Sequence, residues 1–340
     1  LAASASGGKT GTGAVGAALQ GALDAVFSSK VDRSLPADLR LTGVTIAVTG
    51  AGRGLGLSIA KALARRGANL IVLNRSLCDE TVAALKQEPG ADGTIRAVRI
   101  DLESVASVDA AVARLRADGV TLGCLVLNAG MLPGGARASK DGVDVMLHVN
   151  CLSSCRLVDG MLAHGVLAPG AAGLGGLGGL PRVVVVGSEA HRSSPPLALS
   201  DLKPAAPRWE YSMAGVVKYY GHSKLYLHTW ASTLARKQQG SLDVFHLCPG
   251  AVATDIGREG PGWAQPLLKG LMALAFQPPD AAAIPAVWCA AHPAAGGRNG
   301  LYLHLGRERS PSPLASDEGI GDQLWDGMHE LLNHLEAKAK

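Results

Sequence analysis

The chain has 340 residues, 47% of them hydrophobic, and carries a formal net charge of +4 at pH 7. This length and composition suit one large α/β domain or two small ones, and they exclude a disordered protein. The weak positive charge is spread without long basic runs, so we expect no nucleic-acid partner. The six cysteines form no Cys-x-x-Cys pair and have no zinc-type spacing with histidines, which predicts free thiols in a reducing compartment and no metal site.

The N-terminal arm, residues 1–40, is rich in Ala, Gly and Ser and has no charged region ahead of an apolar core. It is either the remnant of a trimmed organelle transit segment or simply the start of the chain, where a packing or tethering role is expected. No run of about 18 apolar residues occurs, so a membrane span is not expected. These features predict an intracellular protein of the cytoplasm or of an organelle such as a chloroplast or mitochondrion.

From Leu41 onward, short apolar runs rich in β-branched residues alternate with helical stretches. The expected strands cover 44–50, 69–74, 94–102, 122–130, 182–188, 243–250 and 301–305. The expected helices include 57–67, 108–119, 143–162 and 221–240. This alternation predicts an α/β fold over residues 41–335: a single Rossmann-type, doubly wound domain with a parallel seven-stranded sheet and helices on both faces.

Two irregular segments interrupt this pattern. Residues 168–181 are a low-complexity Gly-rich insertion, expected on the surface. Residues 254–280 are punctuated by Gly and Pro around the apolar piece PLLKGLMALAF, which is too short to span a bilayer. We expect this second segment to act as a substrate lid with an apolar underside, or alternatively as a peripheral contact with a membrane surface.

A glycine-rich turn, TGAGRGLG, lies directly between the first expected strand and the first helix. Its glycines follow Gly-x-x-x-Gly-x-Gly, whereas other dinucleotide folds use Gly-x-Gly-x-x-Gly. Small residues let a pyrophosphate approach the backbone, and the helix N-terminus offers N–H groups and a positive dipole. A plain tight turn is the alternative. The setting between strand and helix favours cofactor contacts at Thr49, Gly50, Arg53, Gly54, Leu55 and Gly56.

The end of the second expected strand predicts which nicotinamide cofactor is bound. An NAD-preferring site offers a carboxylate here for the ribose hydroxyls, whereas this chain has Asn74 and Arg75. Arg53 supplies a second guanidinium, and two such groups can clamp a 2′-phosphate that a carboxylate would repel. We therefore predict NADP(H) as cofactor; the alternative is that both arginines are ordinary solvated residues.

Further cofactor contacts are expected where the third and fourth strands end. Asp101 and Leu102 follow the third strand, where a carboxylate and the adjacent backbone can receive the adenine amine. Asn128, Ala129 and Gly130 end the fourth strand, beside the place where a dinucleotide lies at the carboxyl edge of such a sheet.

The stretch KYYGHSKLYL holds a candidate acid–base pair. Tyr220 and Lys224 are four residues apart, so on a helix they share one face. A cation beside a phenol favours phenolate, so we expect Lys224 to lower the pKa of Tyr220 toward working pH. Tyr220 can then give a proton to a carbonyl oxygen or take one from an alcohol. Tyr219 is the alternative acid, but Ser223 stands four residues after it, which predicts a packing or pocket role instead.

Together these motifs resemble those of the short-chain dehydrogenase/reductase superfamily, in the family's order and across residues 41–335. The matching elements are TGAGRGLG, NAG at 128–130, Asn150 in HVNCLSS, Ser188 after VVVV, YGHSK at 220–224 and PGAVAT at 249–254. GSEAHR at 187–192, YGHSKLYL and the tail at 314–332 are similar to the retinol-dehydrogenase-like branch. That branch includes the WW-domain oxidoreductase and related proteins of the plastid envelope.

This resemblance implies a reaction and a role for each residue. Tyr220 would exchange the proton, Lys224 would also hold the nicotinamide ribose, and Ser188 would bond the substrate oxygen. Asn150 would hold a water on a proton path. The carboxamide of the cofactor would be positioned by Pro249, Gly250 and Thr254. The expected activity is NADP(H)-dependent reduction of a small lipophilic carbonyl (retinoid-, steroid- or aldehyde-like), or oxidation of the matching alcohol.

The chain departs from this branch at two places near these residues. Residues 151–154 are Cys-Leu-Ser-Ser where the branch has His-Leu-Gly-His, and Cys248 replaces the histidine of the usual His-Pro-Gly. The catalytic side chains remain, but the substrate class is less constrained. The alternative function is a catalytically weak NADPH-binding scaffold or redox sensor, acting as a homodimer or as a subunit of a multiprotein assembly.

Overall fold

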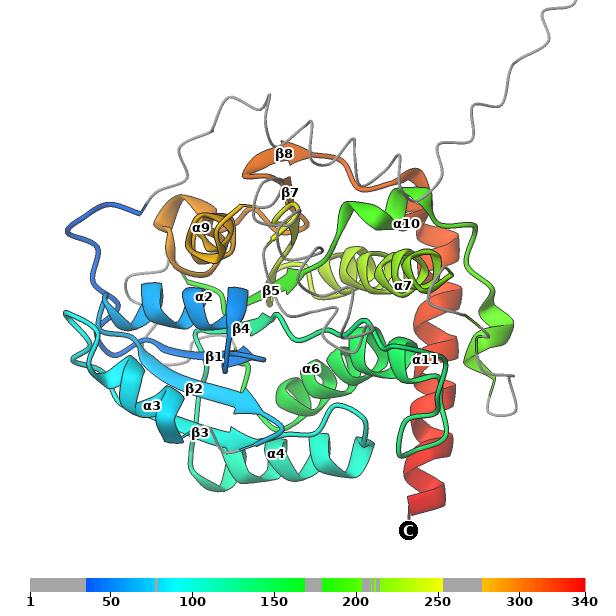
Figure 1. The fold of residues 1–340 in the computed structure, drawn as a ribbon, viewed down its shortest axis with the longest axis horizontal. Helices are drawn as coiled ribbons and strands as arrows, with labels where there is room; N and C mark the ends of the chain where they lie inside the picture. The colour runs from blue at the N-terminus through cyan, green and yellow to red at the C-terminus, as the bar shows by residue number, and fades with distance from the viewer. Residues whose placement is uncertain are drawn as a thin grey trace, which may run out of the picture.

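The computed structural model describes residues 35–76, 79–168, 179–203, 209, 211, 215–252 and 277–339. At its centre is one sheet with the strand order β3-β2-β1-β4-β5-β6-β7-β8 (Figure 1). The strands are β1 (Thr45–Thr49), β2 (Asn69–Asn74), β3 (Ile95–Arg99), β4 (Cys124–Leu127), β5 (Arg182–Val186), β6 (Asp243–Cys248), β7 (Tyr302–His304) and β8 (Arg307–Arg309). Every neighbouring pair from β3 to β7 is parallel, and β8 pairs with β7 in the antiparallel sense.

The strand β8 corrects the prediction of a seven-stranded parallel sheet. β1 to β7 match the seven expected strands, but the chain then reverses and adds a short edge strand. Leu305 and Gly306 have φ values of 50° and 76°, and two positive φ values in succession make the tight turn that joins antiparallel strands. A leucine rarely adopts positive φ, so the residue types gave no sign of this hairpin.

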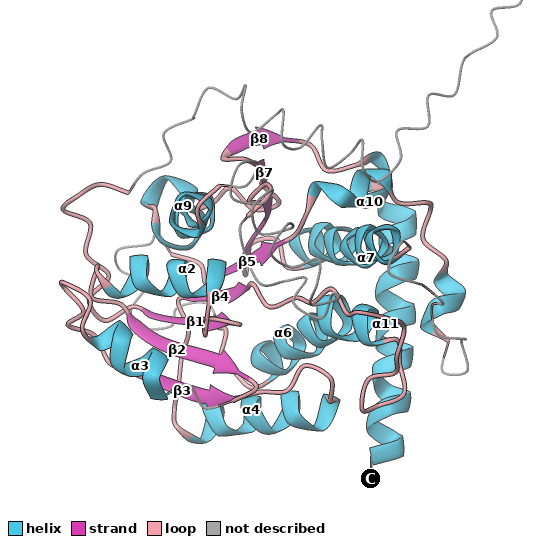
Figure 2. Ribbon diagram, in the orientation of Figure 1, coloured by secondary structure: helices cyan, strands magenta, loops and turns pink. Residues whose placement is uncertain are grey.

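Helices cover both faces of the sheet (Figure 2). They are α2 (Gly54–Ala64), α3 (Asp79–Lys86), α4 (Val105–Ala117), α5 (Val145–Leu147), α6 (Ser153–Ala163), α7 (Val216–Lys237), α9 (Pro279–Ala291), α10 (Pro313–Ser316) and α11 (Glu318–Ala339). One half of the core lies between the sheet and α4, α6 and α7, and the other half lies between the sheet and α2 and α9. The predicted α/β fold with helices on both faces is therefore confirmed.

The strand β5 shows why these sequences form a sheet covered on both sides. All five of its residues are buried. Val183 and Val185 pack with α4, α6 and α7, whereas Val184 and Val186 pack with α2 and α9. Successive side chains of a strand point to opposite faces, so a continuous apolar run is needed where both faces are covered.

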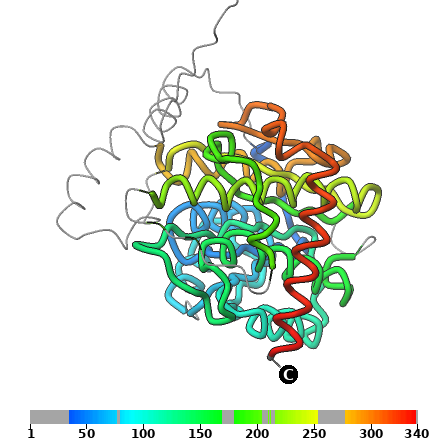
Figure 3. Tube along the Cα trace, turned by 90° about the vertical axis from the view of Figure 1, so that its right-hand side faces the viewer, coloured from blue at the N-terminus to red at the C-terminus, as the bar shows by residue number. Residues whose placement is uncertain are grey.

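The helix α11 packs against α7 and α4 and runs along one side of the molecule (Figure 3). Its buried side chains recur every three or four residues, at Leu324, Met328, Leu331, Leu332 and Leu335. Arg236 of α7 also binds Asp322 of α11 at 2.6 Å. The helix ends at Ala339, and the domain bounds of 41–335 stay a prediction.

Three segments singled out in the sequence lie mostly outside the described residues. Of the N-terminal arm only residues 35–40 are described, of the Gly-rich insertion residues 168 and 179–181, and of the expected lid residues 277–280. The roles predicted for these segments therefore stay predictions. Within the described ranges, no helix is both long enough and apolar enough to cross a membrane.

Candidate active site

The strand order reverses between β1 and β4, and the carboxyl ends of these strands carry the expected glycine turn. Gly50 and Gly54 have φ values of 68° and 52°, a region that side chains disfavour. Gly56 is enclosed still more tightly, because a Cβ there would lie 2.4 Å from both Gly50 O and Asn128 Nδ2. The turn thus forms a backbone cradle at the start of α2, where the N–H groups of the first helical turn can receive a pyrophosphate.

Thr49 and Asn128 join the ends of β1 and β4 around this cradle. Thr49 Oγ1 accepts hydrogen bonds from the N–H groups of Asn128 (2.9 Å) and Ala129 (3.0 Å). Asn128 Nδ2 donates to Thr49 O (3.0 Å) and Gly50 O (3.4 Å). Leu55 is buried in the core below the turn. The side chains of Thr49, Asn128 and Leu55 therefore support the backbone of the cradle.

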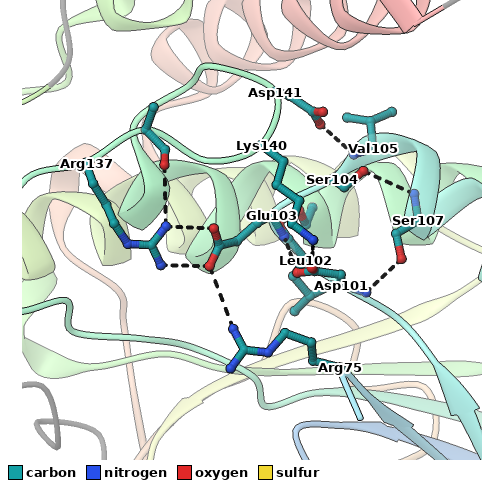
Figure 4. A network of polar contacts seen from close by, with 12 residues as sticks. Arg75, Asp101, Leu102, Glu103, Ser104, Val105, Ser107, Arg137, Lys140 and Asp141 are labelled. Atoms are coloured by element: carbon teal, nitrogen blue, oxygen red, sulfur yellow. Dashed lines mark hydrogen bonds and ion pairs between the residues drawn. The ribbon is translucent and has the colours of Figure 1, made fainter. Parts of the chain in front are cut away.

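A network of ion pairs lies at the end of β3 (Figure 4). Asp101 accepts hydrogen bonds from Lys140 Nζ (2.6 Å) and from the N–H group of Glu103 (3.1 Å). Arg137 holds the Glu103 carboxylate through two hydrogen bonds of 2.7 Å each. Burial acts to raise the pKa of Asp101, but the bonds from Lys140 and Glu103 outweigh it and the pKa is lowered. Asp101 is therefore an anion at neutral pH.

Arg75 stands at the rim of this network. Its Nη1 lies 4.0 Å from Glu103 Oε1, and its side chain is 64% exposed. Asn74 is buried, Leu102 is half-buried, and Arg53, at the N-terminal cap of α2, is exposed. The two guanidinium groups therefore reach solvent from the ends of β2 and the glycine turn, as a phosphate clamp requires.

Asn150 lies in a short π-helical segment, His148–Leu152, between α5 and α6. Its Oδ1 accepts a hydrogen bond from the N–H group of Met131 (2.8 Å), and its Nδ2 donates to Met131 O (3.1 Å) and to Ser223 Oγ (3.0 Å). A π turn inserts an extra residue into a helix and is often found at functional sites. Here it carries an amide that joins the loop after β4 to α7.

Lys224 lies fully inside the protein, one helical turn after Tyr220 on α7. Its Nζ donates a hydrogen bond to Val186 O (3.2 Å) and lies 5.6 Å from the centre of the Tyr220 ring. A Cβ on Gly130 would lie 3.4 Å from both Lys224 Nζ and Asn150 Oδ1, so these groups meet at the end of β4. Burial lowers the pKa of Lys224 to about 8.

Tyr220 differs from the sequence-based expectation in its proton affinity. Burial raises the pKa of its phenol, the nearby Cys248 thiol adds to this, and a hydrogen bond with Ser188 acts in the opposite direction. The expected lowering by Lys224 is therefore wrong: the cation faces the ring from 5.6 Å and burial dominates. Tyr220 keeps its proton at neutral pH, as a proton donor to a carbonyl must.

Ser188 follows β5 and begins a short 3₁₀ helix. Its Oγ accepts a hydrogen bond from the N–H group of Ala190 (3.2 Å) and also bonds with the Tyr220 side chain. Its backbone N–H donates to His228 Nε2 at 3.1 Å. The structure thus brings the four predicted catalytic residues together from the π segment, the end of β5 and α7.

The turn after β6 holds the predicted carboxamide contacts. Gly250 has a φ of 86°, and its N–H group donates to Cys248 Sγ at 3.3 Å. Pro249 O accepts a hydrogen bond from the side chain of Gln277. Thr254 lies outside the described residues. Cys248, in the place of the family's usual histidine, is buried and burial raises its pKa to about 11, so it is a neutral thiol.

Comparison with known proteins agrees with this geometry. Residues 44–190 match the family model described as short chain dehydrogenase. Over 296 residues the chain is 30% identical to dehydrogenase/reductase SDR family member 13 of Bos taurus, covering 86% of this chain and 74% of the relative. This protein belongs to the short-chain dehydrogenase family.

Within the short-chain dehydrogenases, its curated relatives lie in the branch that the motifs predict. It is 32% identical over 284 residues to the polyprenol dehydrogenase of Mus musculus, covering 82% of this chain and 80% of the relative. It is 27% identical over 297 residues to retinol dehydrogenase 13 of Homo sapiens, covering 85% of each. The resemblance to the retinol-dehydrogenase-like branch is therefore confirmed.

Solved structures with this fold hold either nicotinamide cofactor. One from Burkholderia cenocepacia, in complex with NADP, has a TM-score of 0.56 and 25% identity, covering 78% of this chain and 97% of that one. An NADH-dependent reductase complexed with NAD shares the fold, with a TM-score of 0.56 and 22% identity over 80% of this chain and 98% of that one. The choice of cofactor must therefore be argued from this chain's own residues.

His228 is a residue near this short-chain dehydrogenase site that the sequence analysis missed. It lies on α7 four residues after Lys224 and eight after Tyr220, so the three share one helix face. The spacing Tyr-x-x-x-Lys-x-x-x-His was the available signal. Tyr219 lies on another face, with its ring 5.6 Å from that of Trp209 and 5.3 Å from that of Tyr211, as its predicted packing role requires.

Among the described residues, Cys155 and Asp159 of α6 and His329 of α11 gather groups that can ligate a metal. Asp159 Oδ2 accepts a hydrogen bond from Cys155 Sγ (3.4 Å) and lies 3.0 Å from His329 Nε2. The Asp159 hydrogen bond raises the pKa of His329, so an imidazolium–carboxylate pair accounts for these contacts. The absence of a metal site stays a prediction.

Proposed function

We propose that this protein is an NADP(H)-dependent oxidoreductase that transfers hydride between nicotinamide and a lipophilic carbonyl or alcohol. The observation that carries the proposal is the placement of Tyr220. Its phenol bonds with the Ser188 side chain, and the Lys224 ammonium faces its ring at 5.6 Å. A proton donor, a second hydroxyl and a buried cation are what the reduction of a carbonyl needs beside the hydride.

The glycine cradle at 50–56 fits a dinucleotide, because a Cβ on Gly56 would fill it. When bound, the nicotinamide supplies or accepts the hydride. Lys224, one turn below Tyr220, would bind the ribose hydroxyls with its ammonium. Gly130 lies beside that ammonium at the end of β4, since a Cβ there would lie 3.4 Å from Lys224 Nζ, and the turn at Gly250 would position the carboxamide.

On the substrate side, Tyr220 and Ser188 would both hydrogen-bond the reacting oxygen. Tyr220 gives up its proton as negative charge develops on that oxygen, and Ser188 stabilises the same charge. Lys224 then stabilises the resulting phenolate. Asn150, held by Met131 and Ser223, would order the water through which Lys224 exchanges protons with solvent.

The preference for NADP(H) rests on the residues at the ends of β2 and β3. No carboxylate ends β2, where Asn74 and Arg75 stand, and the nearest acidic groups, Asp101 and Glu103, are already bound by Lys140 and Arg137. Arg75 and Arg53 can therefore reach a 2′-phosphate without an unpaired anion beside it. The Burkholderia cenocepacia relative binds NADP on the same fold.

A lipophilic substrate is supported by the relatives. Retinol dehydrogenases and polyprenol dehydrogenases, by their names, act on long apolar alcohols, and they share 27–32% identity with this chain.

The test is NADPH oxidation with retinaldehyde, aliphatic aldehydes and quinones, comparing wild type with Tyr220→Phe. Loss of the phenolic proton should reduce kcat by about 10²-fold or more on any substrate turned over. Tyr219→Phe is the matched control, because it removes a hydroxyl from the adjacent tyrosine but keeps the ring against Trp209. Tight NADPH binding without turnover on any substrate would contradict the proposal and favour an NADPH-binding scaffold.

A further inference from the structure

His228 places an imidazole directly against the backbone that carries Ser188. The side chain is fully buried. Its Nε2 accepts a hydrogen bond from the N–H group of Ser188 at 3.1 Å. Gly187 makes this approach feasible, because a Cβ at that position would lie 2.0 Å from His228 Nε2. The glycine before the catalytic serine and the histidine two turns after the catalytic tyrosine therefore fit each other.

The contacts of His228 fix its tautomer. Because Nε2 accepts the proton of a backbone amide, the ring's own proton lies on Nδ1. That Nδ1 lies 3.0 Å from His246 Nδ1, so His228 donates and His246 accepts. His246 belongs to β6, two residues before Cys248 and the turn at Pro249 and Gly250. A hydrogen-bonded path thus runs from Ser188 through His228 to β6, the strand that leads into this turn.

A second histidine holds the same residue from its carbonyl side. His191 Nδ1 donates to Ser188 O at 2.7 Å, and its Nε2 accepts the N–H group of Ser312 at 3.1 Å. The rings of His191 and His228 lie 4.3 Å apart. Both peptide groups of Ser188 are therefore bonded to buried imidazoles, each of which must be uncharged to accept its own bond.

We propose that His228 is a positioning residue, which fixes the backbone of Ser188 so that its hydroxyl meets Tyr220 and the substrate oxygen. The inference rests on the proposed function, since it gives Ser188 a task in that reaction. An apolar side chain of similar size would fill the same space but leave the buried N–H group of Ser188 unpaired. The strand end could then rotate away to find another partner, and Ser188 Oγ would leave its place beside Tyr220.

A double-mutant cycle tests this mechanism. His228→Leu should lower kcat by about ten- to hundredfold when Ser188 is present, because a displaced catalytic group loses most of its effect. In a Ser188→Ala background the same change should cost little, since no hydroxyl remains to be positioned. Equal losses in both backgrounds would overturn the proposal and leave His228 a packing residue.

Two further variants separate the hydrogen bond from packing. His228→Gln places an amide oxygen where Nε2 lies, so it should restore most of the kcat lost in His228→Leu. Thr229→Val is the control, because it alters the next residue of the same buried turn, whose hydroxyl has no hydrogen-bond partner among the described residues. Its kcat should match wild type. Failure of Gln to rescue, in a folded variant, would count against the proposal.

Nitrogen-15 NMR of histidine-labelled wild type tests the same bond without turnover, with His228→Gln used to assign the signal. His228 should show a protonated Nδ1 and an unprotonated, hydrogen-bonded Nε2. A proton on Nε2 would overturn the proposal whatever the activity. Equal rates for wild type and Tyr220→Phe would instead contradict the proposed function. The NMR result would still show whether His228 accepts the hydrogen bond from the N–H group of Ser188.

Discussion

The ammonium of Lys224 lies 5.6 Å from the centre of the Tyr220 ring, and burial acts on the two groups in opposite directions. It lowers the pKa of Lys224 to about 8 and raises the pKa of Tyr220. The tyrosine is therefore protonated throughout the physiological range, whereas the lysine titrates close to it. The alkaline limit of activity should come from the lysine.

The first prediction concerns this alkaline limit. The value of kcat/KM for NADPH reports ionisations of the free enzyme, so it should fall above about pH 8 as Lys224 loses its proton and its hold on the ribose. In Lys224→Arg, which stays charged, this alkaline fall in kcat/KM should disappear even if the maximal rate is lower. Initial rates of carbonyl reduction between pH 6 and 10 provide the measurement. An alkaline fall that persists unchanged in Lys224→Arg would show that another group is responsible.

The second prediction concerns the glycine cradle. In Gly56→Ala the new methyl group would lie 2.4 Å from Gly50 O and Asn128 Nδ2, both part of the turn itself. Relief of this overlap must displace the turn, so NADPH affinity should fall at least about tenfold and the free energy of unfolding by about 1–3 kcal/mol. Fluorescence titration and thermal unfolding measure the two effects.

Gly135→Ala serves as the control for this substitution. A Cβ at Gly135 meets nothing within 4 Å, so that variant should bind NADPH and unfold as wild type does. If Gly56→Ala bound NADPH with unchanged affinity, the cradle would not be the pyrophosphate site.

The third prediction concerns cofactor choice. Arg75→Ala should weaken NADPH binding by about tenfold, the loss of one charge-assisted hydrogen bond, and leave NADH binding unchanged. Arg114→Ala is the matched control. Arg114 is an exposed arginine of α4 that pairs with Asp118 near the amino ends of β1, β2 and β3, away from Arg75 at the carboxyl end of β2. Equal effects of Arg75→Ala on both cofactors would contradict a 2′-phosphate contact.

The elements that the sequence predicted correctly are those set by local pattern. Continuous valine runs such as β5 occur where helices cover both faces, and the spacing of Tyr220 and Lys224 places them on one face of any helix. The cradle was predictable because Gly50 and Gly56 have steric reasons to be glycine in that turn.

What the sequence did not yield depends on contacts between distant segments. The hairpin to β8 puts Leu305 at positive φ, a conformation its residue type disfavours. The raised pKa of Tyr220 follows from burial, which a spacing of four residues does not report. The bond between Ser188 and His228 joins residues 40 positions apart, and only the packing of α7 against the 3₁₀ helix that follows Ser188 reveals it.

The last prediction uses the buried histidines as a stability probe. Burial lowers the pKa of His246 to about 3 and the pKa of His228 well below its ordinary value. Repulsion from His191 adds to both shifts, and repulsion from Lys224 and Arg192 adds to that of His228. The unfolded chain therefore binds more protons than the folded protein below pH 6.5, so stability is present above that pH and is lost as the pH falls. Each of these two histidines should remove about 1.3 kcal/mol between pH 7 and 5.5.

Urea unfolding at these two pH values measures the loss, and substitution isolates its source. His246→Gln should be less stable than wild type at pH 7, because His228 Nδ1 loses its acceptor, yet its stability should decline less steeply toward pH 5.5. His334→Gln, at an exposed position of α11, should follow the wild-type slope. Comparing how steeply the stability of the two variants falls with pH cancels the contributions of other titrating groups, including buried His148. An unchanged pH dependence in His246→Gln would mean that His246 is not the neutral acceptor that the hydrogen-bonded path requires.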